Sequence, residues 1–119
     1  MDGVDPSSAV ADDEALWRRV HSTQLVPDGS GAKRVSSAAF KDPEMSVDRR
    51  LIREACGQGV VDSLGSSAAL AEVSAGACVA RGQECRPDPL VENPSHALVV
   101  GKKTKPTAQA LAAAAQLVA

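Results

Sequence analysis

Short apolar runs, separated by glycine, proline and polar residues, predict a series of β-strands along this chain. The clearest run covers residues 96–100, which Pro94 and Gly101 bound on its two sides. Further strands are predicted at residues 16–21, 31–40, 45–47 and 68–74, and the last of these segments also fits a short helix. A turn rich in proline and glycine at residues 27–31 separates the first two strands.

Apolar residues spaced three and four apart predict two helices. Residues 48–56 form the first, with Asp48 as its N-cap and a glycine just after its end. Residues 107–118 form an alanine-rich second helix, with Thr104 or Lys105 as its cap and a proline in the first turn. A further helical turn is predicted at residues 75–81, and residues 57–67 are predicted to be loop.

These elements predict one small α+β domain, with a mixed or antiparallel sheet of three to five short strands and two or three helices. The length of 119 residues suits a single core. Residues 1–11 show no periodicity and are predicted to be a flexible leader, with the globular domain at 12–119. The only aromatic residues are Trp17 and Phe40, so the core must consist of aliphatic side chains and alanine. These side chains contribute less buried area per residue, so we expect a partner surface to help stabilise the fold.

The formal net charge of −2 argues against a nucleic-acid-binding protein, which usually carries a strongly basic face. The acidic N-terminus does not resemble a secretory signal, and the apolar run around residues 108–119 is too short to span a bilayer. A cytoplasmic protein without a membrane segment is therefore predicted. Cys56, Cys78 and Cys85 follow no common metal or disulfide spacing, so reduced thiols and no metal or cofactor are expected.

Candidate functional residues lie on three predicted strands. His21 ends the first, next to Arg18 and Arg19, Ser37 lies in the second, and His96 begins the third. If these ends meet, the arginines suit a phosphate, the hydroxyl suits orientation, and the imidazoles suit proton transfer. We therefore predict His21, Ser37 and His96 as catalytic candidates and the two arginines as substrate-binding candidates. Each side chain also suits an ordinary role as a cap or as surface charge.

Two adjacent lysines between the last strand and the last helix are candidates for anion binding. The sequence Gly101-Lys102-Lys103-Thr104 resembles the end of a phosphate-binding loop, in which backbone amides and a lysine hold phosphate. The motif is incomplete, because His96 occupies the position of its first glycine and Lys103 separates Lys102 from the hydroxyl. Lys102 and Lys103 are therefore predicted only as weak anion-binding residues, with solvated charge as the alternative.

Five short motifs occur in order at residues 18–21, 37–40, 45–47, 86–89 and 96–97. On these motifs the chain resembles a group of small, functionally uncharacterised bacterial proteins, whose pattern runs R-R-I-H, S-x-A-F, L-S-V, R-P-D-P and H-A. This resemblance covers roughly residues 16–100 and implies no activity.

The order of the predicted strands supports a second resemblance. A strand bearing arginine and histidine precedes a strand bearing serine, which is similar to small ADP-ribosyltransferase-like and RNA phosphotransferase-like folds. That resemblance implies a nicotinamide dinucleotide bound between split sheets, with Glu72 or Glu92 as the candidate catalytic glutamate.

Two functional hypotheses follow from these observations. The first is a non-catalytic binding or accessory module that acts through a protein partner or as a homo-oligomer. The alternative is a small transferase or toxin-like enzyme that acts on a nucleotide or another phosphate-bearing substrate. The enzyme hypothesis requires Arg18, His21, Ser37 and His96 to line one pocket.

Overall fold

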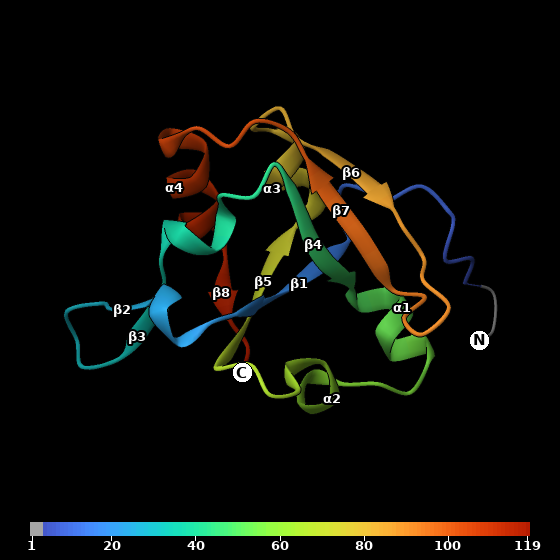
Figure 1. Ribbon diagram of the computed structural model, residues 1–119, viewed down its shortest axis with the longest axis horizontal. Coiled ribbons are helices and arrows are strands. Elements are labelled where there is room, and N and C mark those ends of the chain that lie inside the picture. The colour runs from blue at the N-terminus through green and yellow to red at the C-terminus, as the bar shows by residue number, and fades with distance from the viewer. Residues whose placement is uncertain (1–3) are drawn as a thin grey trace.

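The computed structural model describes residues 4–119 and has a six-stranded antiparallel sheet in the order β6-β7-β4-β1-β5-β8 (Figure 1). The first three residues of the predicted leader lie outside the described part. The strands are β1 Ala15–Val20, β4 Glu44–Arg49, β5 Ala69–Ser74, β6 Glu84–Pro87, β7 His96–Val100 and β8 Gln116–Leu117. A separate hairpin pairs β2 (Leu25–Pro27) with β3 (Lys33–Val35).

Four α-helices accompany the strands in the described residues, together with 3-10 helices at Ser22–Gln24 and Ser37–Phe40. The α-helices are α1 Arg50–Ala55, α2 Val60–Leu64, α3 Ala75–Val79 and α4 Lys105–Ala114. The predicted small α+β class is therefore confirmed. The predicted count of three to five strands is wrong, because the main sheet has six and the hairpin adds two, and the helices exceed the predicted two or three.

Two predicted segments differ from the structure because local capping bonds form there. Residues 31–40 contain only the short strand β3, since the Ser36 hydroxyl accepts a hydrogen bond from the Ala38 amide at 3.2 Å and starts a 3-10 helix. Residues 57–67, predicted to be loop, contain α2. The Asp62 carboxylate accepts a hydrogen bond from the Gly59 amide at 3.1 Å at the start of that helix.

The predicted helix ends are partly wrong. Asp48 lies inside β4 and does not cap α1, because its carboxylate accepts hydrogen bonds from Asn93 and Ser95. Of the two predicted caps of α4, Thr104 and Lys105, the structure has Thr104, whose hydroxyl accepts from the Thr107 amide at 3.3 Å. That helix ends earlier than predicted, at Ala114, and the residues after it form β8, the edge strand beside β5.

The hydrophobic core lies on one face of the sheet, where α3, α4 and the second 3-10 helix pack against it (Figure 1). Alternate strand residues point to this face because side chains alternate across a strand. Aliphatic residues dominate it, as predicted, and Phe40 is its only aromatic member. The largest contributors are Leu16, Val20, Phe40, Met45, Val99 and Leu111. Trp17 lies on the opposite face, where the Arg50 guanidinium is 5.9 Å from the centre of its ring.

The main sheet splits along its middle. β1 and β4 pair only through Leu16 with Arg49 and Trp17 with Asp48. Beyond these two pairs, β1 continues with β5 and β4 continues with β7, so the two halves of the sheet diverge (Figure 1). The split leaves backbone carbonyls of β4 without a partner strand on that side.

A buried ion pair connects the N-terminal residues to the sheet. Arg49 is 1% exposed and donates from Nε and Nη2 to the two carboxylate oxygens of Glu14, at 2.7 and 2.9 Å. Its Nη1 also donates to the carbonyls of Pro6 and Ser8. Burial raises the pKa of Glu14, but the hydrogen bonds from Arg49 and from the Ala11 amide, with the Arg49 charge, lower it overall below its ordinary value.

Among residues 4–119, no helix is both long enough and apolar enough to cross a membrane.

Candidate functional site

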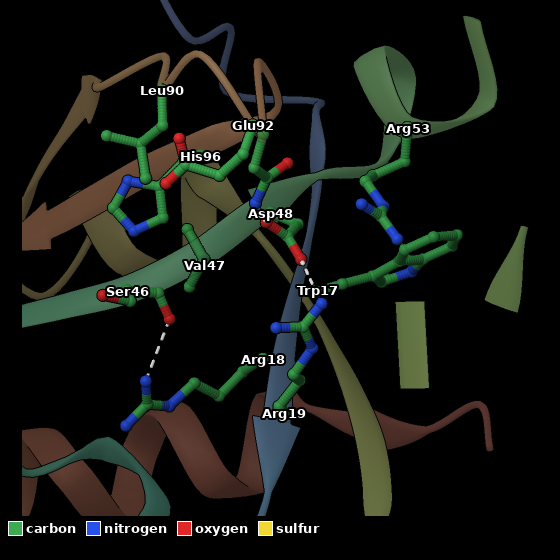
Figure 2. Close-up of a pocket in the computed structure, with 11 residues that line it drawn as sticks. Trp17, Arg18, Arg19, Ser46, Val47, Asp48, Arg53, Leu90, Glu92 and His96 are labelled. Atoms are coloured by element: carbon green, nitrogen blue, oxygen red, sulfur yellow. Dashed lines mark hydrogen bonds and ion pairs between the residues drawn. The ribbon is translucent and has the colours of Figure 1, made fainter. Parts of the chain in front are cut away.

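A hollow of about 510 Å³ lies over the split between β1 and β4 (Figure 2). Alternation along the strands places Arg19, Asp48 and His96 on the face of the sheet opposite the core. Arg18 points to the other face, but its guanidinium reaches the hollow because the strands have separated there. Arg53 enters from α1. The lining therefore includes residues from β1 and β4, which flank the split, from the neighbouring strand β7, and from the helix α1.

Arg18 spans the split and is held by three acceptors. Its Nε donates to the Ala39 carbonyl at 3.1 Å and its Nη1 to the Ser46 carbonyl at 2.9 Å. Its Nη2 forms an ion pair with Asp42 at 3.2 Å. The side chain is 15% exposed. Arg18 thus supplies β4 with the hydrogen bond that a neighbouring strand would otherwise give, and it holds a positive charge at the edge of the hollow.

Arg19 and Arg53 both bind Ser63, a fully buried residue of α2. Arg19 Nε donates to the Ser63 carbonyl at 2.7 Å, and Arg53 Nε donates to the Ser63 hydroxyl at 2.9 Å. That hydroxyl donates in turn to the Gly59 carbonyl at 2.8 Å. Arg53 is 6% exposed, whereas the Arg19 side chain is 49% exposed. One helix therefore orients two guanidinium groups at the hollow and leaves Arg19 open to solvent.

Asp48 is the buried carboxylate of the site. Its Oδ1 accepts from Asn93 Nδ2 at 2.8 Å and from the Ser95 hydroxyl at 3.2 Å. Its Oδ2 lies 3.8 Å from Arg19 Nη2, in an ion pair longer than a hydrogen bond (Figure 2). Asp48 is therefore well satisfied by neutral donors, and its link to Arg19 is the weakest of its contacts.

His96 and Asp88 form a hydrogen-bonded pair beside the hollow. His96 Nδ1 lies 2.9 Å from Asp88 Oδ2 and 3.2 Å from the Asp88 carbonyl oxygen. A carbonyl oxygen only accepts, so Nδ1 carries the ring proton and Nε2 of the neutral ring is the acceptor. The Asp88 amide also donates to the His96 carbonyl at 3.0 Å. This double connection fixes the orientation of the imidazole.

The predicted site residues are only partly brought together. Arg18, Arg19 and His96 line the hollow over the split. His21 lines a second hollow of about 480 Å³, which shares both arginines with the first. Its Nδ1 accepts a hydrogen bond from the Thr23 amide at 3.3 Å, so it caps a 3-10 helix. Ser37 lines a third hollow, beside α4, that contains none of the other predicted residues.

The two predicted lysines lie outside these three hollows. Lys102 is exposed. Lys103 turns back on its own loop, where Nζ donates to the carbonyls of Val99 at 2.8 Å and Gly101 at 3.3 Å. Burial lowers the pKa of Lys103 below its ordinary value. Its ammonium therefore closes the end of β7 in this structure, near enough to Arg18 for the positive charge of that guanidinium to lower the pKa of Lys103 further.

Several site residues carried no functional signal in the sequence. Arg53 occurred as a polar position of a predicted helix, and Asp88 occurred between two prolines. Asp48 was assigned to a cap, and Ser63 to a loop. The sequence spacing of these residues does not show which residue each one binds. Arg53 and Ser63 belong to different helices, and Asp88 lies in a loop whereas His96 lies in a strand.

The two glutamates that the second resemblance implied have different places. Glu72 accepts hydrogen bonds from Trp17 Nε1 at 2.9 Å and from Arg50 Nη1 at 3.1 Å. Glu92 lines the hollow over the split. Asp48 and Glu92 bring two carboxylates to the lining of that hollow, and Arg18, Arg19 and Arg53 bring three guanidinium groups. The lining therefore has an excess of positive charge.

Comparisons with known proteins add no further assignment. No protein-family model matches the chain, and no curated protein or solved structure matches it either. Within residues 4–119, no group of three or more histidine, cysteine, aspartate or glutamate side chains is placed to hold a metal ion. The site is therefore interpreted from its own geometry.

Proposed function

We propose that the protein binds a small phosphate-bearing ligand of the nucleotide class in the hollow over the split sheet. The observation that carries this proposal is the arrangement of Arg18, Arg19 and Arg53 around one hollow. Guanidinium groups bind phosphate through paired N–H donors, and their charge is permanent. A volume of about 510 Å³ lies within the range of small-molecule sites.

Arg19 is the residue best placed to contact such a ligand. Its Nε is held by Ser63, while its side chain is half exposed and its other contact is the 3.8 Å ion pair with Asp48. A phosphate oxygen competes with that distant carboxylate for Arg19 Nη2, while Asp48 keeps its hydrogen bonds from Asn93 and Ser95. Arg18 and Arg53 contribute charge from more buried positions.

His96 adds a proton acceptor to the proposed site. With Nδ1 bound to Asp88, Nε2 is free to accept a hydrogen bond from a ligand hydroxyl. The transferase alternative also requires His21 and Ser37, and these residues line other hollows. The geometry therefore supports ligand binding better than a reaction that uses all of the predicted catalytic residues together.

The proposal is tested by thermal shift and calorimetry with inorganic phosphate, AMP, ADP and adenosine. A ligand that binds the native state raises the melting temperature by mass action. We expect AMP and ADP to raise it, adenosine to have little effect, and Arg19→Gln to weaken binding by about tenfold or more. Arg81→Gln is the matched control, since Arg81 is exposed and away from the hollow. Absence of a shift with every phosphate compound would overturn the proposal.

A second candidate function is the docking of a protein partner or a second copy of the chain. The loop between β6 and β7 exposes two adjacent apolar residues, with Val91 fully exposed and Leu90 38% exposed. Exposed apolar side chains that lie together favour an interface. Sedimentation velocity tests self-association: a dimer that Val91→Asp dissociates supports it. A monomer at every concentration restricts this candidate to a partner of another sequence.

The proposed location is the cytoplasm. This location is supported by the sequence, in which three cysteines follow no common disulfide spacing, as in many proteins of a reducing compartment.

A further inference from the structure

The second hollow, of about 480 Å³, adjoins the hollow over the split, and Arg18 and Arg19 line both of them. It lies where β1 ends and β5 begins. The Ala68 amide, just before β5, donates to the carbonyl of Val20, the last residue of β1, at 3.1 Å. This bond holds the residues that follow β1 beside those that precede β5. The second hollow therefore takes its lining from the ends of two neighbouring strands, and two arginines join it to the proposed nucleotide site.

The charges that line the two hollows differ. In the hollow over the split, the carboxylates of Asp48 and Glu92 oppose the charge of the arginines. In the second hollow, no described lining residue carries a carboxylate to oppose Arg18 and Arg19, so its potential favours an anion. Arg19 is half exposed, and its Nη1 forms no hydrogen bond with residues 4–119. The second hollow therefore suits a further anionic group of a ligand that already contacts Arg19.

Neutral donors in the lining of the second hollow are available to such an anion. The hydroxyls of Ser22 and Ser67 form no hydrogen bond within the described part of the chain. His21 accepts at Nδ1 from the Thr23 amide at 3.3 Å, so its neutral ring carries the proton on Nε2, which is then a donor. Phosphate oxygens accept hydrogen bonds from hydroxyl and imidazole groups as well as from guanidinium groups. The second hollow thus combines permanent positive charge with unused donors.

We propose, on the basis of the nucleotide binding already proposed, that the second hollow is a subsite for the terminal phosphates of a nucleoside di- or triphosphate. The nucleoside and the first phosphate of that ligand occupy the hollow over the split. Successive phosphates in such a chain share a bridging oxygen, so one guanidinium group can contact two of them. Arg19 lines both hollows and is placed for this contact. His21, predicted from the sequence as a catalytic residue, then serves as a donor to the terminal phosphates.

Calorimetry with AMP, ADP and ATP tests the subsite on the full chain. The titrations are made without divalent cations and at constant ionic strength, because salt screens the charges involved. We expect ADP and ATP to bind about tenfold or more tightly than AMP, since only they carry phosphates beyond the first. Binding of AMP, ADP and ATP with equal affinity would overturn the subsite and leave the nucleotide proposal standing. Absence of binding by all three overturns both proposals.

Ser67→Asp and Ser67→Asn are a matched pair of variants, because they place a charged and a neutral side chain of similar size at one position of the second hollow. The carboxylate of Ser67→Asp is expected to repel the terminal phosphates and to reduce the preference for ATP over AMP by about tenfold. Ser67→Asn is expected to keep most of that preference. Gln109→Glu is the control for net charge, since Gln109 is exposed and lines neither hollow. Equal preferences in the three variants would contradict the subsite.

His21→Asn provides a second test that does not depend on Ser67. Asparagine keeps a side-chain acceptor for the 3-10 helix that His21 caps, and it lacks the Nε2 donor. We expect the variant to weaken ATP binding several-fold more than AMP binding, and circular dichroism checks that the fold is kept. Equal weakening of the two nucleotides would contradict the contact between His21 and the terminal phosphates.

Discussion

Arg18 donates from Nη1 to the Ser46 carbonyl oxygen at 2.9 Å, across the gap where β1 and β4 stop pairing. A side chain therefore takes the place of a strand-to-strand hydrogen bond at this point. The same separation of the strands lets the Arg18 charge reach the hollow on the opposite face of the sheet. Arg18 thus contributes both to the stability of the split sheet and to the charge of the candidate site.

Loss of Arg18 is expected to destabilise the fold. Arg18→Gln removes donors to the Ala39 and Ser46 carbonyls and leaves those acceptors without their partner. The bond to Ala39 is part-buried and the bond to Ser46 is exposed, where water can replace the lost donor. We therefore expect the free energy of unfolding to fall by about 1–2 kcal/mol in urea titrations. The exposed Arg81→Gln is expected to change it by less than about 0.5 kcal/mol. Equal losses in the two variants would contradict this role for Arg18.

The buried pair of Arg49 and Glu14 is expected to dominate stability. Glu14→Gln leaves the Arg49 charge buried without its counter-ion. Breaking a buried pair in this way costs about 3–5 kcal/mol, which chemical denaturation at neutral pH measures. Glu84→Gln is the control, because its pair with Arg86 is exposed on both sides. If both variants lose equal stability, Glu14 has no special role.

The same pair predicts a dependence of stability on pH. The pKa of Glu14 is lower in the folded state than in the unfolded chain, so the folded state holds fewer protons on this group. Its contribution is therefore fully present above the ordinary glutamate pKa of about 4.3, and it is lost as pH falls below that value through the folded pKa. We expect the acid slope of stability to be shallower in Glu14→Gln. Parallel slopes in the two proteins would argue against the pair.

The two histidines are expected to occupy opposite tautomers when neutral. His96 donates from Nδ1 to Asp88, whereas His21 accepts at Nδ1 from the Thr23 amide. His96 therefore carries its proton on Nδ1 and His21 carries its proton on Nε2. Long-range ¹H–¹⁵N correlation spectra above neutral pH distinguish these states. Asp88→Ala is expected to change the pattern of His96 and to leave that of His21 unaltered, and a change in His21 alone would refute the assignment.

Ser63 is expected to influence the site without lining it. Its hydroxyl accepts from Arg53 Nε and its carbonyl accepts from Arg19 Nε. Ser63→Ala removes the first of these bonds and keeps the second, so we expect a loss of about 1 kcal/mol in stability. We also expect AMP to bind several-fold more weakly, because Arg53 loses its orientation. Ser66→Ala is the control, since Ser66 is exposed. Calorimetry with AMP measures the difference, and unchanged affinity in Ser63→Ala would exclude a positioning role.

Much of the secondary structure follows from local pattern. The strand at residues 96–100 was predicted, and the cap of the last helix was narrowed to Thr104 or Lys105, because alternation, β-propensity and capping act between residues close in sequence. Ser36 and α2 show the limit of this reasoning. At each of these places, a helix with a side-chain capping hydrogen bond stands where a strand or a loop was predicted.

The candidate site was predicted less well than the fold. Arg18, Arg19 and His96 were identified because polar residues at strand ends often lie at functional edges, and these three line one hollow. His21 and Ser37 were assigned to the same pocket, but they line different hollows. Sequence order places residues at the ends of strands without showing which strands are neighbours, so it does not determine which ends meet.

The amino-acid sequence by itself determined a small α+β chain with an aliphatic core and several arginines near strand ends. Tertiary structure alone decided that β1 and β4 separate after two residue pairs and that Ser63 joins Arg19 to Arg53. The physical reason is that strand pairing and guanidinium bonds connect residues far apart in sequence. Their energies depend on where the whole chain places each partner, and local periodicity carries no information on that placement.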